Sequence, residues 1–263
     1  MTMLSTREEV ENWLKTYKIK NYSINEDLGI SVDGDVLLPG VAGLIGVLPV
    51  KFRDVSGNFN CSHNYLTSLE GCPSRVGGDF NCYGNELSLL KGCPEYVGGS
   101  FHCNKNKLIS LVGCPKKISG TFTCYGNKLT SLEYCSIEIG QDFYCYKNKL
   151  KSLEFCPKIV GGNFDCSENE LVSLLGGPQD VGRNYVCYNN ELVNLEGCPV
   201  KVGGNFNCSS NKLVSLLGCP KSVDSLKLLI GCPRVVGGEF SCFNNQLTSL
   251  LGGPESVGGS FLL

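Results

Sequence analysis

Hydrophobic and polar positions follow a pattern that recurs at a fixed step through most of the chain, from Phe59 to Phe80 to Phe101 and onward. An aromatic residue opens each repeat, a Cys comes two residues later, an Asn three residues after the Cys, and Leu two and five residues after the Asn. A period of about 21 residues with this internal order is typical of a solenoid. The aromatic positions are Phe59, Phe80, Phe101, Phe122, Phe143, Phe164, Tyr185 and Phe206, followed after an irregular stretch by Phe240 and Phe261.

The spacing within one repeat predicts how a coil of this solenoid is built. The aromatic and the Cys are two residues apart, so both point to the same side of an extended segment, which we expect to be a strand that buries them. Successive coils then stack these strands in parallel, about 4.8 Å apart. The Asn is expected to turn inward, where its amide group can bond backbone groups left unpaired at a tight bend. The Gly-Cys-Pro and Val-Gly-Gly sequences that close the repeat predict an extended return segment, because Gly and Pro disfavour a helix.

Residues 1–55 depart from the repeat. Thr6 and Glu9 have the spacing of a capping box, and Val10, Trp13, Leu14 and Tyr17 fall on one face of a helix. Residues 21–24 and 30–38 read as short extended segments with a turn at Asp33-Gly34. We therefore predict an N-terminal cap over residues 1–35, a degenerate first coil over 36–55 and the regular solenoid over 56–263.

The largest irregularity lies near the C-terminus. The step from Pro220 to Pro233 is shorter than the regular step from Pro199 to Pro220, which predicts a shortened coil at 221–233. Leu226, Leu228, Leu229 and Ile230 would then be partly exposed at a kink or bulge, either as a tolerated deletion or as a docking notch. The chain ends one strand into a new coil, at Phe261, and an uncapped strand edge favours either a small apolar cap or edge-to-edge dimerisation.

Composition and charge exclude several classes of protein. The net charge is −2 and the sequence pI about 5.8, without the basic surface that duplex nucleic acid demands. The chain has no apolar run of transmembrane length, and acidic residues stand where a signal peptide would be apolar, so a cytoplasmic location is expected.

The 17 Cys residues fall in two repeat columns, one after the aromatic and one before Pro. In the second column Gly177 and Gly253 replace Cys, so the position requires a small residue rather than a thiol. We expect free, buried Cys that act as small hydrophobes. No disulfide, metal or cofactor is predicted, since the chain has no CxxC pair and only two His.

The amino-acid sequence of the repeat resembles the repeats of known protein families. The pattern Phe-x-Cys-x-x-Asn-x-Leu-x-Ser-Leu resembles the leucine-rich-repeat core, with Phe and Cys where Leu or Val usually stand, and the short period resembles the bacterial class found in secreted effectors. Leu-Thr-Ser-Leu-Glu-Gly-Cys-Pro, with Val-Gly-Gly-x-Phe-x-Cys, is similar to repeat proteins encoded by large tailed bacteriophages. The resemblance implies a mostly β leucine-rich-repeat solenoid with parallel strands on one face, extended Gly/Pro-rich return segments and a small α/β N-terminal cap.

The outward positions of the strands form the candidate binding face. One column, directly after the Cys, holds several aromatics, and the remainder of the face is Asn, Ser and Thr. Rigid aromatics among small polar groups are typical of binding surfaces, although Tyr also stacks in ladders on ordinary sheets. The candidate partner-binding residues are Tyr83, Tyr125, Tyr144, Tyr146, Tyr188, Phe243, His102 and Asp165.

A run of Lys residues borders the same face in the middle coils. It could recognise an acidic partner or a phosphate, or it could be a solvated edge that keeps stacked coils soluble. Glu residues interrupt the run, which favours the solvated edge. This secondary basic rim consists of Lys105, Lys107, Lys128, Lys147 and Lys149.

These features favour a protein-binding scaffold without enzymatic activity. The sequence suggests no catalytic Ser, His and Asp set and contains no phosphate-binding glycine motif. If the phage resemblance holds, the partner is a host or host-defence protein that is occluded or sequestered in the host cytoplasm. The alternative is a nucleotide-binding or short single-strand-binding protein that uses the Tyr column and the basic rim. Duplex nucleic acid and membrane are not expected partners, and a homodimer through the C-terminal edge stays open.

Overall fold

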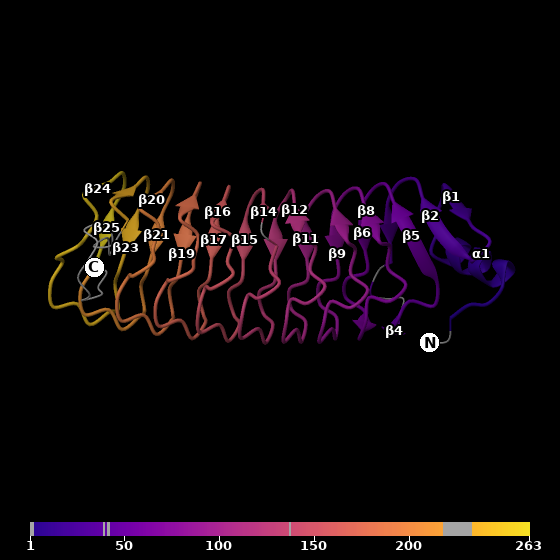
Figure 1. Cartoon of the computed structure of the whole chain (residues 1–263), viewed down its shortest axis with the longest axis horizontal. Helices are drawn as coiled ribbons and strands as arrows, with labels where there is room; N and C mark the ends of the chain where they lie inside the picture. The colour runs from indigo at the N-terminus through magenta and orange to yellow at the C-terminus, as the bar shows by residue number, and fades with distance from the viewer. Residues whose placement is uncertain (1–2, 39, 41–42, 137, 218–232) are drawn as a thin grey trace. The chain divides into compact units, whose positions relative to one another are not determined.

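The computed structural model describes residues 3–38, 40, 43–136, 138–217 and 233–263. Figure 1 shows the course of the chain from the N-terminal helix through the successive coils. The chain divides into two compact units. The first unit comprises Met1–Lys128 with Tyr134–Ser136, and the second comprises Leu129–Glu133 with Ile137–Leu263. Each unit is described by itself.

The N-terminal helix α1 (Arg7–Thr16) forms where the capping box predicts it. Thr6 accepts a hydrogen bond from the Glu9 backbone amide, and the Glu9 carboxylate accepts one from the Thr6 amide, so two unpaired donors are satisfied. Val10 and Leu14 are buried, and the Trp13 ring lies 6.2 Å from the Phe52 ring. The helix therefore covers apolar side chains of the first coils.

Each coil contributes one short strand to each of two parallel sheets. The inward residue of the first sheet is Val or Ile, and that of the second is Phe or Tyr, so we call them the valine sheet and the phenylalanine sheet. In the first unit a further pair, β4 (Ile45–Gly46) with β7 (Tyr65–Leu66), lies apart from both.

In the first unit the valine sheet begins with the antiparallel pair β1–β2 and continues in parallel. Its strands, in spatial order, are β1 (Tyr22–Ile24), β2 (Gly29–Val32), β5 (Lys51–Val55), β8 (Arg75–Val76), β10 (Tyr96–Val97) and β12 (Lys117–Ile118). The phenylalanine sheet consists of β3 (Val36–Leu37), β6 (Phe59–Asn60), β9 (Phe80–Asn81), β11 (Phe101–His102) and β13 (Phe122–Thr123).

The second unit repeats this arrangement. Its valine sheet consists of β14 (Glu138–Ile139), β16 (Ile159–Val160), β18 (Asp180–Val181), β20 (Lys201–Val202), β22 (Val235–Val236) and β24 (Ser256–Val257). Its phenylalanine sheet consists of β15 (Phe143–Tyr144), β17 (Phe164–Asp165), β19 (Tyr185–Val186), β21 (Phe206–Asn207), β23 (Phe240–Ser241) and β25 (Phe261–Leu262).

This architecture confirms the predicted solenoid of stacked repeats and corrects one part of it. The Val-Gly-Gly segment is not merely an extended return, because the Val and its predecessor form the second parallel sheet. The two Gly make the corner between the sheets, where adjacent coils touch. A Cβ added to Gly77 would lie 2.1 Å from the carbonyl oxygen of Ser56, so Gly77 allows the close approach of the two coils at this corner. The parallel pairing of the valine sheet already begins at β2, which pairs with β5.

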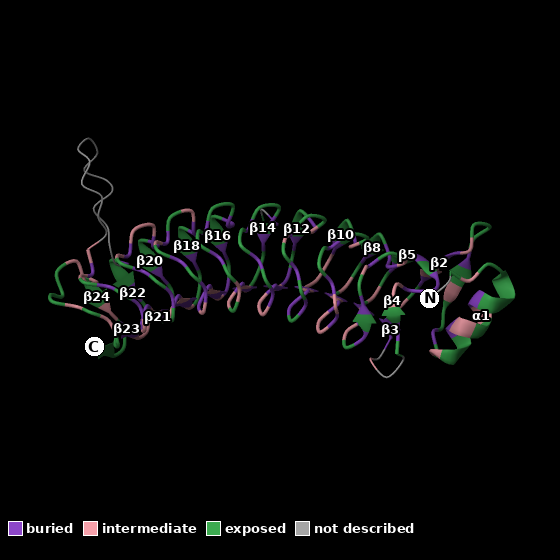
Figure 2. Cartoon of the chain, turned by 90° about the horizontal axis from the view of Figure 1, so that it is seen from below, coloured by how far each residue is buried: buried purple, intermediate pink, exposed green. Residues whose placement is uncertain are grey.

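The core of each coil is built from the predicted inward positions. Phe and Cys of the phenylalanine sheet and both Leu columns are buried, as Figure 2 shows in purple along the inside of the coils, except in the last coils, where Leu250 and Phe261 are exposed. The Phe rings stack from coil to coil, with the Phe59 and Phe80 centroids 5.6 Å apart. None of the fifteen described Cys forms a disulfide, and of these Cys93 and Cys114 are half-buried and the others buried.

The predicted inward Asn column also forms. Asn190, for example, is buried, and its amide nitrogen donates to the carbonyl oxygens of Cys166 and Cys187, both at 3.1 Å. Its amide oxygen accepts from the backbone nitrogen of Leu171 at 3.1 Å. Each Asn of this kind bonds the backbone of its own coil and of the coil before it, which fixes the stacking distance.

The irregular stretch near the C-terminus has an unexpected register. Phe206 pairs directly with Phe240, and their rings lie 5.6 Å apart, as close as the rings of regular coils. The step from Phe206 to Phe240 is nevertheless longer than the regular step from Tyr185 to Phe206, so extra chain is inserted between two directly stacked coils. The predicted exposure of Leu226, Leu228, Leu229 and Ile230 falls on 218–232, outside the described residues.

One aromatic of the phenylalanine column is a Tyr, and its hydroxyl is unsatisfied. Tyr185 is fully buried, and no hydrogen-bond partner for its oxygen is present among the described residues. Gly177, which replaces Cys in the second Cys column, lies beside it: a Cβ on Gly177 would be 3.4 Å from this oxygen. The hydroxyl therefore occupies space that a Cys side chain fills in other coils.

We expect Tyr185→Phe to raise the free energy of unfolding by about 1 kcal/mol, because it removes a buried hydroxyl that has no partner. Gly177→Cys alone should be destabilising, since its thiol would collide with that hydroxyl. The double variant should be at least as stable as the wild type. Urea unfolding of the wild type, the two single variants and the double variant measures this coupling. Strictly additive changes in the free energy of unfolding would show that the Tyr185 hydroxyl and a Cys side chain at position 177 do not compete for the same space.

Candidate functional site

The predicted binding face is the outer side of the phenylalanine sheet, and it is less exposed than expected. The tyrosines that follow Cys are half-buried, and the small residues between them, such as Ser167 and Ser209, are buried. Among the candidate aromatics only Phe243 is exposed, at 44%. The first unit carries Tyr83, His102, Lys105, Lys107, Tyr125 and Lys128, and the second carries Tyr144, Tyr146, Lys147, Lys149, Asp165, Tyr188 and Phe243.

In the first unit, Tyr83 is held between two basic side chains. The Lys105 ammonium lies 5.5 Å from its ring centroid, and the His63 ring meets it edge-on at 4.5 Å. Lys105 and His63 both adopt left-handed backbone conformations, with φ of 49° and 53°. The equivalent position in neighbouring coils is Gly84 or Gly126, so both side chains are carried at some conformational cost.

His102 belongs to a short hydrogen-bonded chain in the same unit. Thr123 donates its hydroxyl to the Asn104 side-chain oxygen at 2.6 Å, and the His102 Nδ1 lies 3.0 Å from the Thr123 oxygen. With the Thr proton directed at Asn104, Nδ1 must donate, which leaves Nε2 of the neutral ring as an acceptor. Burial lowers the pKa of His102, against an opposing effect of Asp79. The ring therefore presents an acceptor at neutral pH.

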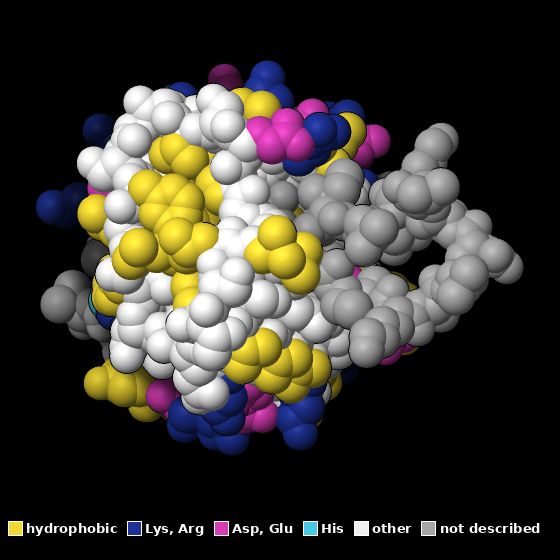
Figure 3. Space-filling model, turned by 90° about the vertical axis from the view of Figure 1, so that its left-hand side faces the viewer, with side chains coloured by type: hydrophobic (Ala, Val, Ile, Leu, Met, Phe, Trp, Pro, Cys, Tyr) yellow, Lys and Arg dark blue, Asp and Glu magenta, His cyan; other side chains and the backbone are white. Residues whose placement is uncertain are grey.

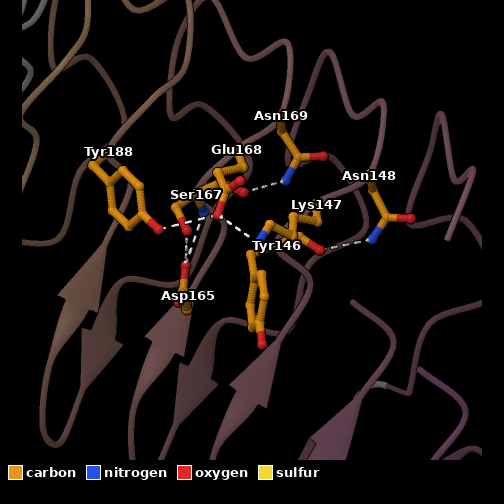
Figure 4. Close-up of polar contacts among 8 residues, drawn as sticks. All are labelled: Tyr146, Lys147, Asn148, Asp165, Ser167, Glu168, Asn169 and Tyr188. Carbon is orange, nitrogen blue, oxygen red and sulfur yellow. Dashed lines mark hydrogen bonds and ion pairs between the residues drawn. The ribbon is translucent and has the colours of Figure 1, made fainter. Parts of the chain in front are cut away.

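In the second unit, Glu168 connects two of the predicted residues. Its carboxylate oxygen accepts from the Tyr188 hydroxyl at 3.1 Å and lies 3.3 Å from the Lys147 ammonium (Figure 4). Burial and the hydrogen bond to Glu168 raise the pKa of Tyr188. The hydrogen bond from its hydroxyl thus fixes the outer end of the Tyr188 ring.

Asp165 lies next to this group and is half-buried. Its Oδ1 accepts from the Ser167 amide at 2.9 Å and from the Ser167 hydroxyl at 2.5 Å. Burial raises the pKa of Asp165, and these two hydrogen bonds oppose that rise. The carboxylate is therefore partly desolvated on the same face as the Tyr rings (Figure 4).

Tyr144 and Tyr146 make an edge-to-face pair with centroids 6.5 Å apart. The Tyr144 hydroxyl donates to Asp142 at 3.1 Å, and Asn163 donates to both of them. Burial, followed by the charge of Asp142, raises the pKa of Tyr144. The second unit consequently presents tyrosine rings that are fixed by hydrogen bonds to acidic side chains.

Ion pairs reduce the positive charge of the basic rim. Lys107 pairs with Glu86, and Lys147 pairs with Glu168 at 3.3 Å. These pairs are exposed and individually weak, but they lower the local potential that a phosphate would meet. The observation favours the solvated-edge interpretation of the rim.

Sequence analysis missed several residues of the face because their role depends on neighbouring coils. Asn58 and Asp79, in the column before Phe, accept from backbone nitrogens one coil further on, Asp79 and Ser100, both at 2.7 Å. This column therefore stabilises the stack rather than serving as free binding surface. Glu168 was missed as well, although its place two residues after Cys, shared with Lys105 and Lys147, was a usable signal.

The structure also bears on the other predicted features. Within the described residues, no three His, Cys, Asp or Glu side chains are grouped so that they could hold a metal ion, and no helix is long and apolar enough to cross a bilayer. At the last described coil, Leu250 and Leu263 are exposed and line a 380 Å³ pocket, and Figure 3 shows apolar side chains gathered on this end.

Comparisons with known proteins find only distant similarity to this chain. No protein-family model matches it, and no curated protein matches it. A solved structure, YopM from Yersinia enterocolitica WA-314, is similar with a TM-score of 0.41 and 18% sequence identity. The match covers 90% of this chain and 60% of YopM, so the chain spans less than two thirds of that protein's length. Likeness of this degree carries no conclusion about function.

Proposed function

We propose that the protein is a non-enzymatic scaffold that binds another protein through the outer face of the phenylalanine sheet. The observation that carries the proposal is the fixed aromatic group of the second unit. Tyr144 and Tyr188 are half-buried, and their hydroxyls are already bonded to Asp142 and Glu168. Rings held in this way lose little conformational entropy when a partner covers them, so less of the binding free energy is spent on ordering side chains.

The charged groups of the face support binding rather than catalysis. Asp165 is bonded to Ser167, and Lys147 to Glu168, so their interactions serve to position side chains. Burial raises the pKa of Cys166 and of Cys187 well above the usual range, which disfavours the thiolate a nucleophile needs. The resemblance to phage repeat proteins extends the proposal to a host or host-defence protein as partner, with occlusion as the mechanism.

The test is affinity capture from bacterial lysate with immobilised protein, read by mass spectrometry. Wild type is expected to retain one stoichiometric protein, and Tyr146→Ala with Tyr188→Ala should reduce its capture at least about tenfold, as expected for aromatic anchors. Ile159→Ala is the matched control, because Ile159 is 66% exposed but lies on the valine sheet. Equal capture by both variants, with unchanged melting temperatures, would show that the face is not the binding surface.

A nucleotide or short single strand is the second candidate, favoured by the Lys105 ammonium over the Tyr83 ring. It predicts absorbance near 260 nm in material released from the purified protein, and binding that weakens steeply with salt. The ion pairs of Lys107 and Lys147 weigh against it.

A further inference from the structure

Two aromatic residues occupy a backbone position that is otherwise reserved for Gly. Tyr134 and Phe155 have φ of 67° and 66°, in the left-handed region that bulky side chains avoid. They stand two residues after the second Leu of their coils. The equivalent described residues of the other regular coils are Gly71, Gly92, Gly113, Gly176, Gly197 and Gly252, all with positive φ.

Burial does not account for these two aromatics. Phe155, in the second unit, is 56% exposed, and Tyr134, in the first unit, is 57% exposed. Gly at either position would relieve the backbone without emptying the core. A strained, exposed aromatic is therefore better explained by contact with something outside its own unit.

The first unit contains a partly apolar groove at the same turn of two earlier coils. Leu89, Leu90, Val112 and Pro115 line a groove of about 820 Å³, together with both half-buried thiols, Cys93 and Cys114, and with Gly92, Gly113, Lys91, Lys116 and Glu95. Leu89 and Val112 are exposed apolar walls. Gly92 and Gly113 stand where Tyr134 and Phe155 carry rings, so the groove lies where two coils lack that side chain.

We propose that Phe155 of one copy of this chain docks into this groove on a second copy. The ring is apolar, as the groove walls are, and the groove volume exceeds that of one aromatic side chain. A patch that complements a pocket elsewhere on the same chain is a direct route to self-association.

Charge is complementary around this contact. Glu154 immediately precedes Phe155 and is exposed, whereas Lys91 and Lys116 stand at the groove rim. Lys91 is already 2.7 Å from Glu70, and Glu95 also lines the groove, so Lys116 is the more available cation for Glu154 of the other copy. The contact therefore combines an apolar anchor with one oriented ion pair.

Sedimentation velocity across a concentration series tests the proposal. Wild type should self-associate at micromolar concentrations. Phe155→Gly and, separately, Leu89→Glu should each weaken association at least about tenfold. The melting temperature of Phe155→Gly measured at monomeric concentration should be no lower than that of the wild type, because the backbone strain is relieved. Val214→Glu is the matched control, since Val214 is 50% exposed and lies outside the groove, and it should associate as the wild type does.

Reversing both charges of the proposed ion pair distinguishes loss of the contact from misfolding. Glu154→Lys and Lys116→Glu should each weaken association, and the double variant should restore it. A wild type that stays monomeric overturns the proposal. So does an association that survives Phe155→Gly and Leu89→Glu but is abolished by Leu262→Lys, which would place the interface at the C-terminal strand β25.

Discussion

Raising the pH from about 8 to about 10 is expected to unfold the protein cooperatively. Burial raises the pKa of its core thiols above their ordinary value, to about 12 for Cys114 and further for others. The unfolded chain releases these protons near pH 8.5, whereas the folded chain retains them. The stabilisation is intact below that pH and is lost as the pH rises through the alkaline range. The thiols concerned are Cys72, Cys82, Cys93, Cys103, Cys114, Cys156, Cys166, Cys187, Cys198 and Cys208.

The effect is large because the thiols act together. One such thiol lowers the free energy of unfolding by about 1.4 kcal/mol for each pH unit above its unfolded pKa, so the set approaches about 14 kcal/mol per unit. Whole domains are stable by only about 5–15 kcal/mol. Urea unfolding at pH 7, 8, 9 and 9.5, followed by circular dichroism, measures the slope.

A double variant provides the control for this prediction. Cys156→Ala with Cys198→Ala removes two of these thiols and should reduce the alkaline slope by about a fifth, whatever it costs at pH 7. A urea midpoint that stays constant from pH 7 to pH 9.5 would show that the thiols do not control alkaline stability.

Loss of one inward Asn is the second large effect. Asn190→Ala removes one hydrogen bond to each of the Cys166 and Cys187 carbonyl oxygens, which keep their bonds from Asn169 and Asn211, and it removes the acceptor of the buried Leu171 amide. The unpaired amide costs about 1–3 kcal/mol and each of the two lost hydrogen bonds about 0.5–1.5 kcal/mol, so we expect a loss of about 2–6 kcal/mol in the free energy of unfolding.

Asn194→Ala is the comparison for this loss. Asn194 lies in the same coil and accepts one hydrogen bond, from the Glu196 amide at 3.0 Å, but it is only half-buried. Its removal should cost under about 1 kcal/mol. Similar losses from both variants in chemical denaturation would mean that the Asn column is not what holds the coils together.

The predicted face illustrates how far a column of residues can be interpreted. Periodicity predicted Tyr144, Tyr146 and Tyr188 on the outer side of a strand; Tyr144 lies in β15, whereas Tyr146 and Tyr188 come two residues after the ends of β15 and β19. It could not show that their hydroxyls are bonded, or that Ser167 between them is buried. Those properties depend on side-chain rotamers and on the neighbouring coil, and a one-dimensional pattern contains neither.

The amino-acid sequence by itself determined the coil. A fixed period places Phe and Cys on one side of an extended segment and brings each Asn to the same bend, and local geometry allows one outcome. Only the tertiary structure decided what depends on contacts between coils. The two-residue valine strand is too short to show alternation, and it becomes a sheet because the next coil supplies its hydrogen bonds. Likewise, the longer step from Phe206 to Phe240 is interpretable only from their pairing, because register is a property of two chain segments and not of one.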